Sequence, residues 1–217
     1  MRIDKDSYGT LALVYGISTA VAVLLLLFVR NPLIVWPVIA LLLWFITWQT
    51  AFFRVPVRKR NGNSHSITSV ADGRVVILEK AFEPEVLKTE CMQLSVYMNF
   101  FDVHSNFWPM DGKVVRYEYH PGDHMLAFHE KSSLLNEHTC VLIAAQNGKE
   151  LLFKQIAGGF ARRIVCHAEK GQKVTAGAQC GIIKFGSRID MFLPLDADIK
   201  VKLGDLVRAS ETILAEI

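Results

Sequence analysis

The sequence predicts a mainly β domain, built as a barrel or sandwich, preceded by an α-helical membrane hairpin. Three observations lead to this fold class. Two long uncharged apolar runs lie near the N-terminus. Beyond residue 61, short apolar runs alternate with turn-forming pairs, and helical periodicity is weak. In that region two pairs of short segments also repeat each other, as paired strands joined by tight turns do.

The two apolar runs extend over residues 11–29 and 33–53. Each is about as long as a helix needs to cross the hydrocarbon core of a bilayer. The break at 30–32 is typical of a turn, and a second run argues against a cleaved signal peptide. We therefore expect residues 1–53 to form a helical hairpin that anchors the chain in a membrane. A hairpin that bends at Pro37 and dips into the bilayer without crossing it stays open.

The charges that flank the apolar runs predict an orientation. Arg2 and Lys5 precede the first run, and four basic residues follow the second: Arg54, Arg58, Lys59 and Arg60. Only Arg30 lies at the tip between the runs. Because cytoplasmic loops carry an excess of Lys and Arg, we expect a cell-membrane protein whose main domain is on the cytoplasmic side.

Net charge and cysteine spacing argue against several classes of function. A net charge of +3 is too small to indicate nucleic-acid binding, and beside a membrane anchor it fits an anionic lipid surface better. The cysteines show no C-x-x-C spacing and lie in apolar, strand-like segments. We therefore expect reduced, buried thiols rather than disulfides or a metal site at Cys91, Cys140, Cys166 and Cys180.

After the hairpin we expect a linker over 54–67, because 61–66 is rich in Gly, Asn and Ser, and then the β domain over 68–217. Helical periodicity in this domain is limited to 84–88 and 155–163.

Two internal repeats support paired strands in this domain. An Asp-Gly turn followed by a basic residue and two valines occurs at 71–76 and again at 110–115. A second pattern at 170–177 is repeated at 203–210 and resembles the hammerhead repeats of biotinyl and lipoyl carrier domains.

The pair Gly186-Ser187 is suited to a backbone that cuts itself. Glycine has no Cβ, so another group can approach its carbonyl closely. The serine hydroxyl, one bond away, can attack that carbonyl once a base removes its proton. From the dipeptide alone a hairpin turn is the more common interpretation, and the surrounding motifs change that balance.

Five segments in order resemble the phosphatidylserine decarboxylase family in its short proenzyme form, over essentially all of residues 68–217. They are Val70-Ala71-Asp72-Gly73, Phe100-Phe101-Asp102-Val103-His104-Ser105-Asn106, Asn136-Glu137-His138-Thr139, Gln155-Ile156-Ala157-Gly158 with Ala161-Arg162-Arg163-Ile164, and Phe185-Gly186-Ser187-Arg188-Ile189-Asp190.

This resemblance implies a self-processed enzyme of phospholipid biosynthesis. Ser187 would attack the carbonyl of Gly186, and elimination would leave a β chain of residues 1–186 and an α chain of residues 187–217. The α chain would begin with a covalent pyruvoyl group, the cofactor, formed from Ser187 with release of ammonia. That group would form a Schiff base with the amine of phosphatidylserine and withdraw electrons as carbon dioxide leaves, giving phosphatidylethanolamine.

Supporting roles follow from the need for a base near the serine. His104 is the candidate base or proton donor, and Asp72 is the candidate acid that orients it. Longer family members carry two histidines three residues apart here, whereas this chain has Phe107 at the second position. Either His104 has more than one role or another group, such as His138, contributes. We assign substrate binding to Arg188 and His138.

Each of these residues also has an ordinary structural interpretation. Asp72 in an Asp-Gly pair is by default a turn residue, and His104 beside aromatic residues could be a core histidine. A metal site is expected at none of the histidines His120, His124 and His129, because a Pro-Gly pair breaks the segment and no Cys or Glu completes a ligand set. For Arg162-Arg163, a surface or structural role is favoured over contact with the lipid phosphate.

Two other functions stay in view. A non-enzymatic, membrane-anchored, lipoyl-like β adaptor of a transport complex would explain the apolar N-terminus and the repeats, but not Gly186-Ser187, and no heptad pattern supplies its usual coiled coil. A decarboxylase of an ether-lipid phosphatidylserine would see the same head group. The expected partners are phosphatidylserine in the bilayer, the chain's own α and β chains and, through edge strands, a second copy in a homodimer.

Overall fold

The computed structural model describes residues 1–122, 136–158, 163–184 and 187–217. The chain divides into two compact units, Met1–Val57 and Arg58–Ile217.

The first unit is the expected helical hairpin. Helices α1 (Tyr8–Phe28) and α2 (Pro32–Phe52) are joined by a short turn, and a 3-10 turn η1 (Lys5–Ser7) precedes α1. The two-residue strands β1 (Arg2–Ile3) and β2 (Arg54–Val55) pair antiparallel and close the unit.

Local chemistry explains where the second helix begins. The Asn31 side chain accepts a hydrogen bond from the Leu33 N–H at 3.0 Å, and Pro32 occupies the first helical position, where its missing N–H costs no hydrogen bond. Pro37 lies inside α2 without ending it. Between the helices, the Tyr15 hydroxyl and Thr50 Oγ1 are 2.6 Å apart.

Both helices are long and apolar enough to cross a membrane, and most of their side chains are exposed. A helix that is apolar all round has no polar face to present to water, so lipid is its natural surrounding. The expected membrane association therefore has support in the length and composition of the two helices.

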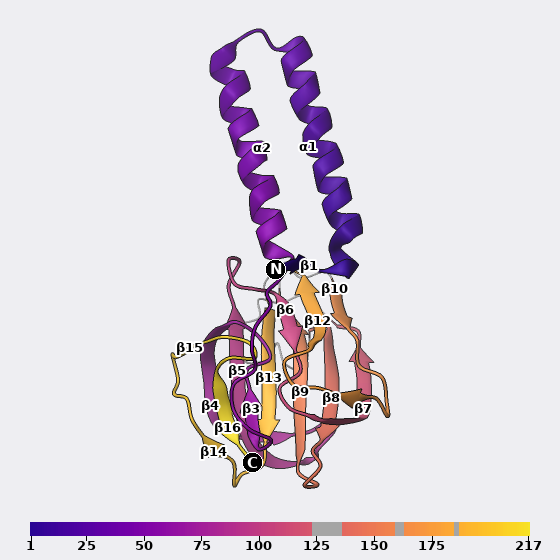
Figure 1. Cartoon of the computed structure of the whole chain (residues 1–217), viewed down its shortest axis with the longest axis vertical. Coiled ribbons are helices and arrows are strands. Elements are labelled where there is room, and N and C mark those ends of the chain that lie inside the picture. The colour runs from indigo at the N-terminus through magenta and orange to yellow at the C-terminus, as the bar shows by residue number, and fades with distance from the viewer. Residues whose placement is uncertain (123–135, 159–162, 185–186) are drawn as a thin grey trace. The chain divides into compact units, whose positions relative to one another are not determined.

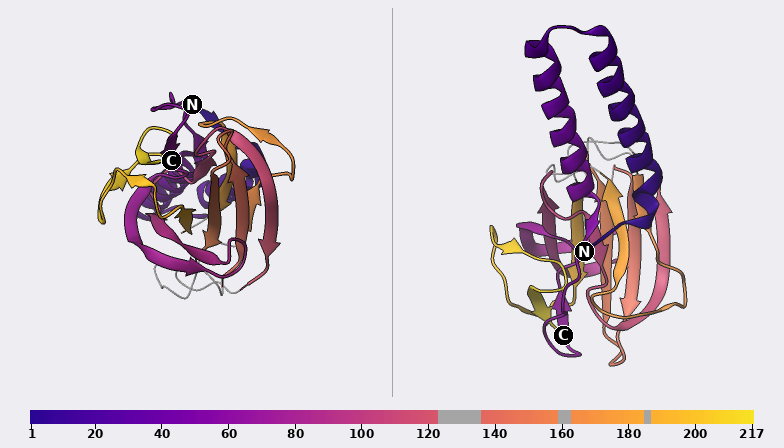
Figure 2. Two further views of the ribbon diagram at one scale, coloured as in Figure 1. Left: turned by 90° about the horizontal axis from the view of Figure 1, so that it is seen from below. Right: turned by 45° about the horizontal axis from the view of Figure 1, so that its top comes forward.

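The second unit is built from antiparallel strands, as predicted (Figure 1). Its main sheet has eight strands in the order β11-β7-β8-β9-β13-β5-β4-β15, and it curls round the smaller sheets β10-β12-β6 and β14-β16-β3 (Figure 2). The bounds are β3 Ser66–Thr68, β4 Gly73–Glu83, β5 Thr89–Met98, β6 Ser105–Phe107, β7 Gly112–His120, β8 His138–Ala144, β9 Glu150–Ala157, β10 Arg163–Cys166, β11 Lys173–Val174, β12 Gln179–Lys184, β13 Ser187–Leu193, β14 Asp198–Ile199, β15 Leu206–Val207 and β16 Ile213–Glu216.

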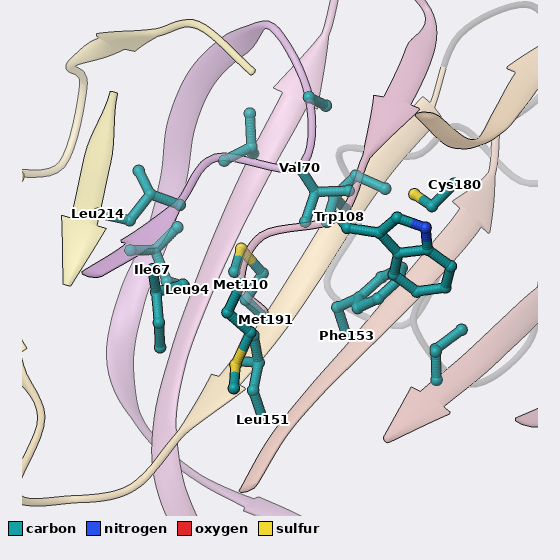
Figure 3. Packing of buried hydrophobic residues seen from close by; sticks show 14 of the residues in the cluster. Ile67, Val70, Leu94, Trp108, Met110, Leu151, Phe153, Cys180, Met191 and Leu214 are labelled. Atoms are coloured by element: carbon teal, nitrogen blue, oxygen red, sulfur yellow. The ribbon is translucent and has the colours of Figure 1, made fainter. Parts of the chain in front are cut away.

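Residue alternation decides which side chains fill the core. On β13, Ile189, Met191 and Leu193 belong to the large apolar cluster on the inner face of the curled sheet. Trp108 and Phe153 meet edge to face there, with ring centroids 6.0 Å apart (Figure 3).

A smaller apolar cluster lies on the opposite, outer face of the same sheet. It comprises Cys91, Cys140, Leu142, Leu152 and Phe192, and Val86 and Leu87 of the β4–β5 connection pack against it.

Both internal repeats seen in the sequence pair with each other. Val174 of β11 lies opposite Gly112 of β7, and Val207 of β15 lies opposite Gly73 of β4. A Cβ on Gly73 would lie 2.1 Å from the Tyr97 carbonyl oxygen, and its φ of +154° suits glycine, so the Asp-Gly pair is needed for this close approach.

Three sequence expectations differ from the structure. Part of the segment expected as a linker belongs to the second unit, because β3 joins a sheet there. Of residues 84–88, expected to show helical character, 84–87 form a turn, and 155–157 belong to β9. Strand pairing with β8 and β13 outweighs the weak local periodicity at this site.

Three of the four cysteines are buried, as expected, and their reduced state stays a prediction. All four are free: Cys91, Cys140 and Cys180 are buried, and Cys166 is partly buried.

Candidate active site

Ser187 is the first residue of β13 and is fully buried. In the sheet it lies opposite Met98 of β5 on one side and Ala157 of β9 on the other. Alternation along β13 turns its side chain to the inner face, where Ser187 Oγ lies 3.8 Å from Met98 Sδ. Gly186, the expected cleavage partner, lies outside the described residues.

A row of buried neutral polar side chains leads to Ser187 along the inner face. Thr139 Oγ1 donates to Gln155 Oε1 at 2.9 Å, and Gln155 Nε2 donates to Asn106 Oδ1 at 2.8 Å. The row ends where Asn106 Nδ2 lies 3.9 Å from Met98 Sδ, the same sulfur that Ser187 Oγ contacts. All these side chains are at most 1% exposed.

Sequence reasoning missed this row, although its three members fall within the quoted motifs. The available signal was alternation. Thr139 and Gln155 occupy the positions of β8 and β9 that face the core, where apolar residues are expected. A polar residue at such a position is buried and needs a partner, so it is a candidate for function.

His104 is fully buried and immediately precedes β6. Its Nδ1 lies 3.0 Å from the main-chain oxygen of Asp102. Because a carbonyl oxygen only accepts, Nδ1 carries the proton, and in the neutral ring Nε2 carries the lone pair that a base requires. The backbone oxygen of Asp102 therefore orients the ring.

Asp72 lies at the junction of the two repeats. Its carboxylate binds Arg58, with Arg58 Nη2 2.6 Å from Oδ2, and Oδ1 accepts from the Ala209 N–H at 2.8 Å. Asp111 makes the equivalent bonds in the other repeat, with Arg60 and the Ala176 N–H. The described contacts of Asp72 are those of a repeat junction, and they do not include His104.

Arg188 and Asp190 point to the outer face, away from the Ser187 hydroxyl. Both are fully buried, and the guanidinium binds the carboxylate through two bonds, Nε to Oδ1 at 2.7 Å and Nη2 to Oδ2 at 3.0 Å. Gln93 Nε2 also reaches Asp190 Oδ2 at 3.4 Å. A bidentate pair of this kind holds both groups in a fixed geometry.

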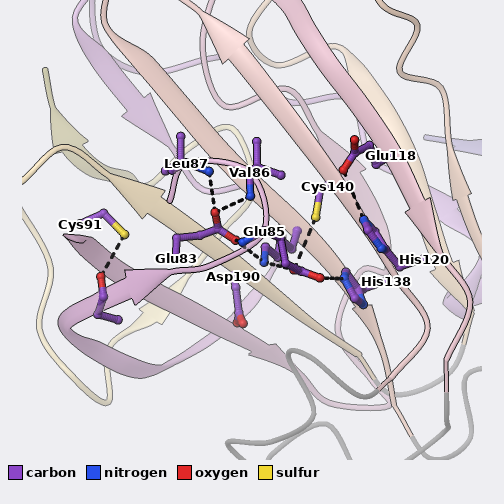
Figure 4. Close-up of polar contacts among 12 residues, drawn as sticks. Glu83, Glu85, Val86, Leu87, Cys91, Glu118, His120, His138, Cys140 and Asp190 are labelled. Carbon is purple, nitrogen blue, oxygen red and sulfur yellow. Dashed lines mark hydrogen bonds and ion pairs between the residues drawn. The ribbon is translucent and has the colours of Figure 1, made fainter. Parts of the chain in front are cut away.

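His138 also lies on the outer face, at the start of β8 (Figure 4). Its Nδ1 is 2.7 Å from the Asn136 main-chain oxygen, and its Nε2 is 3.2 Å from Glu85 Oε1. Asn136 in turn donates from Nδ2 to the oxygen of Ala157, which lies opposite Ser187 in the sheet. His138 is thus connected to the serine's strand neighbour.

A buried ion cluster continues from His138 across the outer face. Lys154, 1% exposed, binds Glu83 Oε1 at 2.6 Å and also binds Glu85. Glu83 further accepts the N–H groups of Val86 and Leu87 at 2.8 and 2.6 Å, so the cluster ties down the β4–β5 connection.

Each charged group of this cluster stabilises the ionised form of its partners. Burial alone would raise the pKa of Glu83, but hydrogen bonds from Lys154 and from the Leu87 N–H lower it below its usual 4.5. Burial likewise would raise the pKa of Glu85, and Lys154 and His138 lower it. For Lys154 burial works in the lowering direction, yet its pKa is raised above its usual 10.5 because anionic partners surround it.

One group of side chains has potential metal ligand atoms within 4.8 Å of one another: His120, His138 and Cys140. The two imidazoles stack in parallel, with centroids 4.6 Å apart, and both nitrogens of His138 already face oxygen atoms. Burial raises the pKa of the Cys140 thiol to about 12, which keeps it protonated. The group therefore fits a hydrogen-bonded stack better than a metal centre. His124 and His129 lie outside the described residues.

A cavity of about 420 Å³ opens at the other end of β8, beyond Ala144, far along the strand from His138. Its lining does not include Ser187 and consists of Ser64, His65, Asp111, Ala145, Gln146 and Asn147. The candidate site at Ser187 is therefore defined by its buried side-chain contacts and not by this cavity.

Arg162, expected at the surface, lies outside the described residues, while its neighbour Arg163 is exposed at the start of β10.

Comparison with known proteins gives one consistent family. The family model described as "Phosphatidylserine decarboxylase" matches residues 45–215. A phosphatidylserine decarboxylase proenzyme of Cytophaga hutchinsonii is 39% identical over 219 aligned residues, covering 100% of this chain and 99% of that protein. A protein of the same name from Amoebophilus asiaticus is 45% identical over 78% of this chain and 76% of that protein. Another from Porphyromonas gingivalis is 33% identical over 100% of this chain and 99% of that protein.

Proposed function

The chain belongs to the phosphatidylserine decarboxylase family, and on this premise we propose that it is a proenzyme that converts phosphatidylserine to phosphatidylethanolamine and carbon dioxide. The observation that carries the proposal is the family match across the segment in which Ser187, the second residue of the Gly-Ser pair, begins a central strand and is fully buried. Neither the lipoyl-like adaptor nor the ether-lipid enzyme has support in the comparisons.

We propose that the cofactor is a pyruvoyl group made from Ser187. When formed, it supplies a carbonyl that takes up electrons from an amine substrate. The surroundings of Ser187 fit such a group. Ser187 is out of reach of bulk water, and its side chain contacts the neutral Met98, whose sulfur also contacts the neutral Asn106. A neutral, water-free pocket protects a reactive carbonyl from side reactions.

The proposed processing follows from the chain's own atoms. Ser187 Oγ attacks the carbonyl carbon of Gly186 as a base takes the hydroxyl proton, and the peptide nitrogen is released as an amine, which leaves an ester. Removal of the Cα proton of Ser187 then expels the Gly186 carboxylate and leaves a dehydroalanine. That elimination breaks the last bond between the two chains, 1–186 and 187–217, and the imine tautomer of the dehydroalanine then reacts with one water and loses ammonia to leave the keto group.

His104 is the proposed base. The Asp102 main-chain oxygen fixes its buried ring so that Nε2 has the lone pair needed to take the Ser187 hydroxyl proton. The later removal of the Ser187 Cα proton is not assigned to a particular group. Asp72 is kept as a hypothesis for the orienting acid, but its described bonds to Arg58 and Ala209 are also explained by the repeat junction.

Arg188 and His138 were expected to bind the head group. Each is bonded to an oxygen partner on the outer face, Arg188 to Asp190 and His138 to Glu85. We propose that they first support the strand ends around Ser187. Direct contact with a substrate phosphate or carboxylate requires these bonds to be exchanged for bonds to the lipid.

The proposed setting is the cell membrane, with the hairpin as anchor and the second unit on the cytoplasmic side, as the basic flanks favour. An anchored enzyme meets its lipid without extracting it, which would expose acyl chains to water at about 0.8 kcal/mol per CH2. A homodimer is also proposed, through the edge strands of the sheets.

Intact mass of the purified full chain, beside a Ser187→Ala variant, tests the proposal. We expect two chains from the unaltered protein, the shorter one lighter than a serine-started peptide by the mass of ammonia, and one uncut chain from the variant. Conversion of phosphatidylserine in vesicles should accompany cleavage. An uncut, inactive wild-type chain would falsify the proposal.

A further inference from the structure

We propose that the Asn106 carboxamide is the hydrogen-bond donor for the keto oxygen that residue 187 carries after processing. The inference rests on the proposed function, since that oxygen exists only in the processed chain. It names a residue to which the motifs alone gave no role, and its role follows from the direction of a hydrogen-bond row.

The hydrogen bonds of the row run in one direction, from Thr139 to Asn106. The Thr139 hydroxyl donates to Gln155 Oε1, which leaves the Gln155 amide nitrogen as the donor towards Asn106 Oδ1. An amide whose oxygen is occupied in this way must present its NH2 group at its other end. Asn106 Nδ2 is thereby held towards Met98 and the start of β13.

The donor at the end of the row has only a poor acceptor among the described residues. Asn106 Nδ2 contacts Met98 Sδ at 3.9 Å, and a thioether sulfur accepts hydrogen bonds weakly. Asn106 is fully buried, so it is out of reach of bulk water. Leaving a buried amide N–H poorly satisfied is unfavourable, which is reason to look for a better partner in the mature enzyme.

That partner is expected at residue 187. Ser187 Oγ lies 3.8 Å from the same sulfur atom, so the serine side chain and the Asn106 amide both contact Met98 Sδ. Processing removes the hydroxyl from Cβ of residue 187 and places a carbonyl oxygen, supplied by water, on Cα in exchange for the nitrogen. A donor that reaches this oxygen from the inner face polarises the carbonyl and makes its carbon more reactive towards an amine, in the manner of a preorganised oxyanion-type donor.

Backbone packing keeps the row in place. A Cβ added to Gly181 of β12 would lie 2.1 Å from the Val165 oxygen and 3.1 Å from Gln155 Nε2. Glycine at this position therefore allows β12 to lie against the Gln155 amide.

The test uses the full chain with Asn106→Leu and Asn106→Asp, each processed and each compared with the unaltered protein. The first readout does not depend on turnover: it is the rate at which hydroxylamine labels the α chain, followed by intact mass. We expect labelling and kcat to fall about 10²–10³-fold in Asn106→Leu, because the donor is lost. The extent of processing should change far less, since the donor is not yet engaged in the proenzyme.

Asn106→Asp separates a donor role from a packing role. A protonated Asp carboxyl can donate from this position and an ionised one cannot. The labelling rate relative to wild type should therefore recover as pH is lowered for Asn106→Asp and stay low for Asn106→Leu. Equal labelling rates for wild type and processed Asn106→Leu would overturn the proposal.

A further variant covers the case in which Asn106→Leu fails to fold or to process. Thr139→Val removes the first donor of the row and lets the Gln155 amide turn over, so labelling should fall by a smaller factor, about tenfold, while Thr139→Ser should restore it. Labelling unchanged in Thr139→Val would count against the proposal in that case. If the unaltered chain itself yields no labelled α chain, the proposed function fails, and that outcome is distinct from failure of the role of Asn106.

Discussion

Strands β8, β9 and β13 carry buried polar side chains on both faces, and the two faces satisfy them differently. On the inner face, Thr139, Gln155 and Asn106 form a neutral row of hydrogen bonds that ends beside Ser187. On the outer face, Lys154 is enclosed by two carboxylates, and Arg188 is enclosed by Asp190.

The difference has a physical consequence for each face. A buried charge needs an opposite charge beside it, so the charged groups of the outer cluster bind one another. The cluster therefore serves to hold β9 and the β4–β5 connection together. A row of neutral amides has a direction and ends in a donor that can be offered to something else. The face that is proposed to carry chemistry is thus the uncharged one, and the charged face holds the strands that position it.

The largest effect is expected from opening the outer cluster with Lys154→Met. Glu83 and Glu85 would then lose their counter-charge, with Glu83 fully buried, and removal of one partner from a buried ion pair costs about 3–5 kcal/mol. Chemical unfolding of the full chain in detergent measures the loss. The control is Lys149→Met, whose partner Asp196 is 70% exposed, and it should change stability by less than about 1 kcal/mol. Equal losses in the two variants would contradict the contrast between the buried and exposed pairs.

The same cluster predicts how stability depends on pH. The carboxyl pKa values of Glu83 and Glu85 are lowered in the folded state, so their contribution is complete above the usual 4.5 and is lost as pH falls through the folded values. The pKa of Lys154 is raised, so its contribution is complete below 10.5 and is lost only as pH rises through the folded value. The wild-type chain should therefore lose this stabilisation on acidification and keep it at neutral pH.

Lys154→Met should reverse the acid side of that profile. Without the ammonium, burial is the main influence on the two carboxyl groups and raises their pKa values. The stability deficit relative to wild type should then be largest near neutral pH and become smaller as pH approaches 4.5. Unfolding curves over this range provide the check, and a deficit that grows on acidification would show that Glu83 and Glu85 do not depend on Lys154.

The sequence predicted those parts of the molecule that depend on local pattern. Uncharged runs predicted the two helices, and the repeats predicted strands that turn out to pair with each other, as Val174 with Gly112 and Val207 with Gly73. The polar row was not predicted, because Asn106 and Gln155 lie 49 positions apart and only the fold brings their amides together. Similarly, an Asp-Gly pair shows no sign in the sequence that its carboxylate will bind Arg58.

The repeat junctions supply a matched pair for the role of Asp72. Asp72→Asn and Asp111→Asn each weaken bonds to one arginine and one backbone N–H, so both should lose about 1.5–3 kcal/mol of stability. The extent of self-cleavage, measured by intact mass for both, separates the two interpretations. Cleavage lost in Asp72→Asn alone assigns Asp72 to the orientation of the base, whereas matched cleavage restricts it to the repeat junction.

The smallest change in stability is expected from substitutions at two neighbouring residues of β8, which compare the two faces of the sheet. Thr139 points inward and Cys140 points outward. Thr139→Val leaves Gln155 Oε1 without its donor and should cost about 1 kcal/mol. Cys140→Val removes only a thiol whose sulfur is 3.9 Å from Glu85 Oε2. The free energy of unfolding should therefore change by close to zero in this variant. Valine replaces each side chain at similar size, so unfolding measurements compare hydrogen bonding rather than volume. A greater loss at Cys140 would mean that the outer face depends on its thiol as well as on its charges.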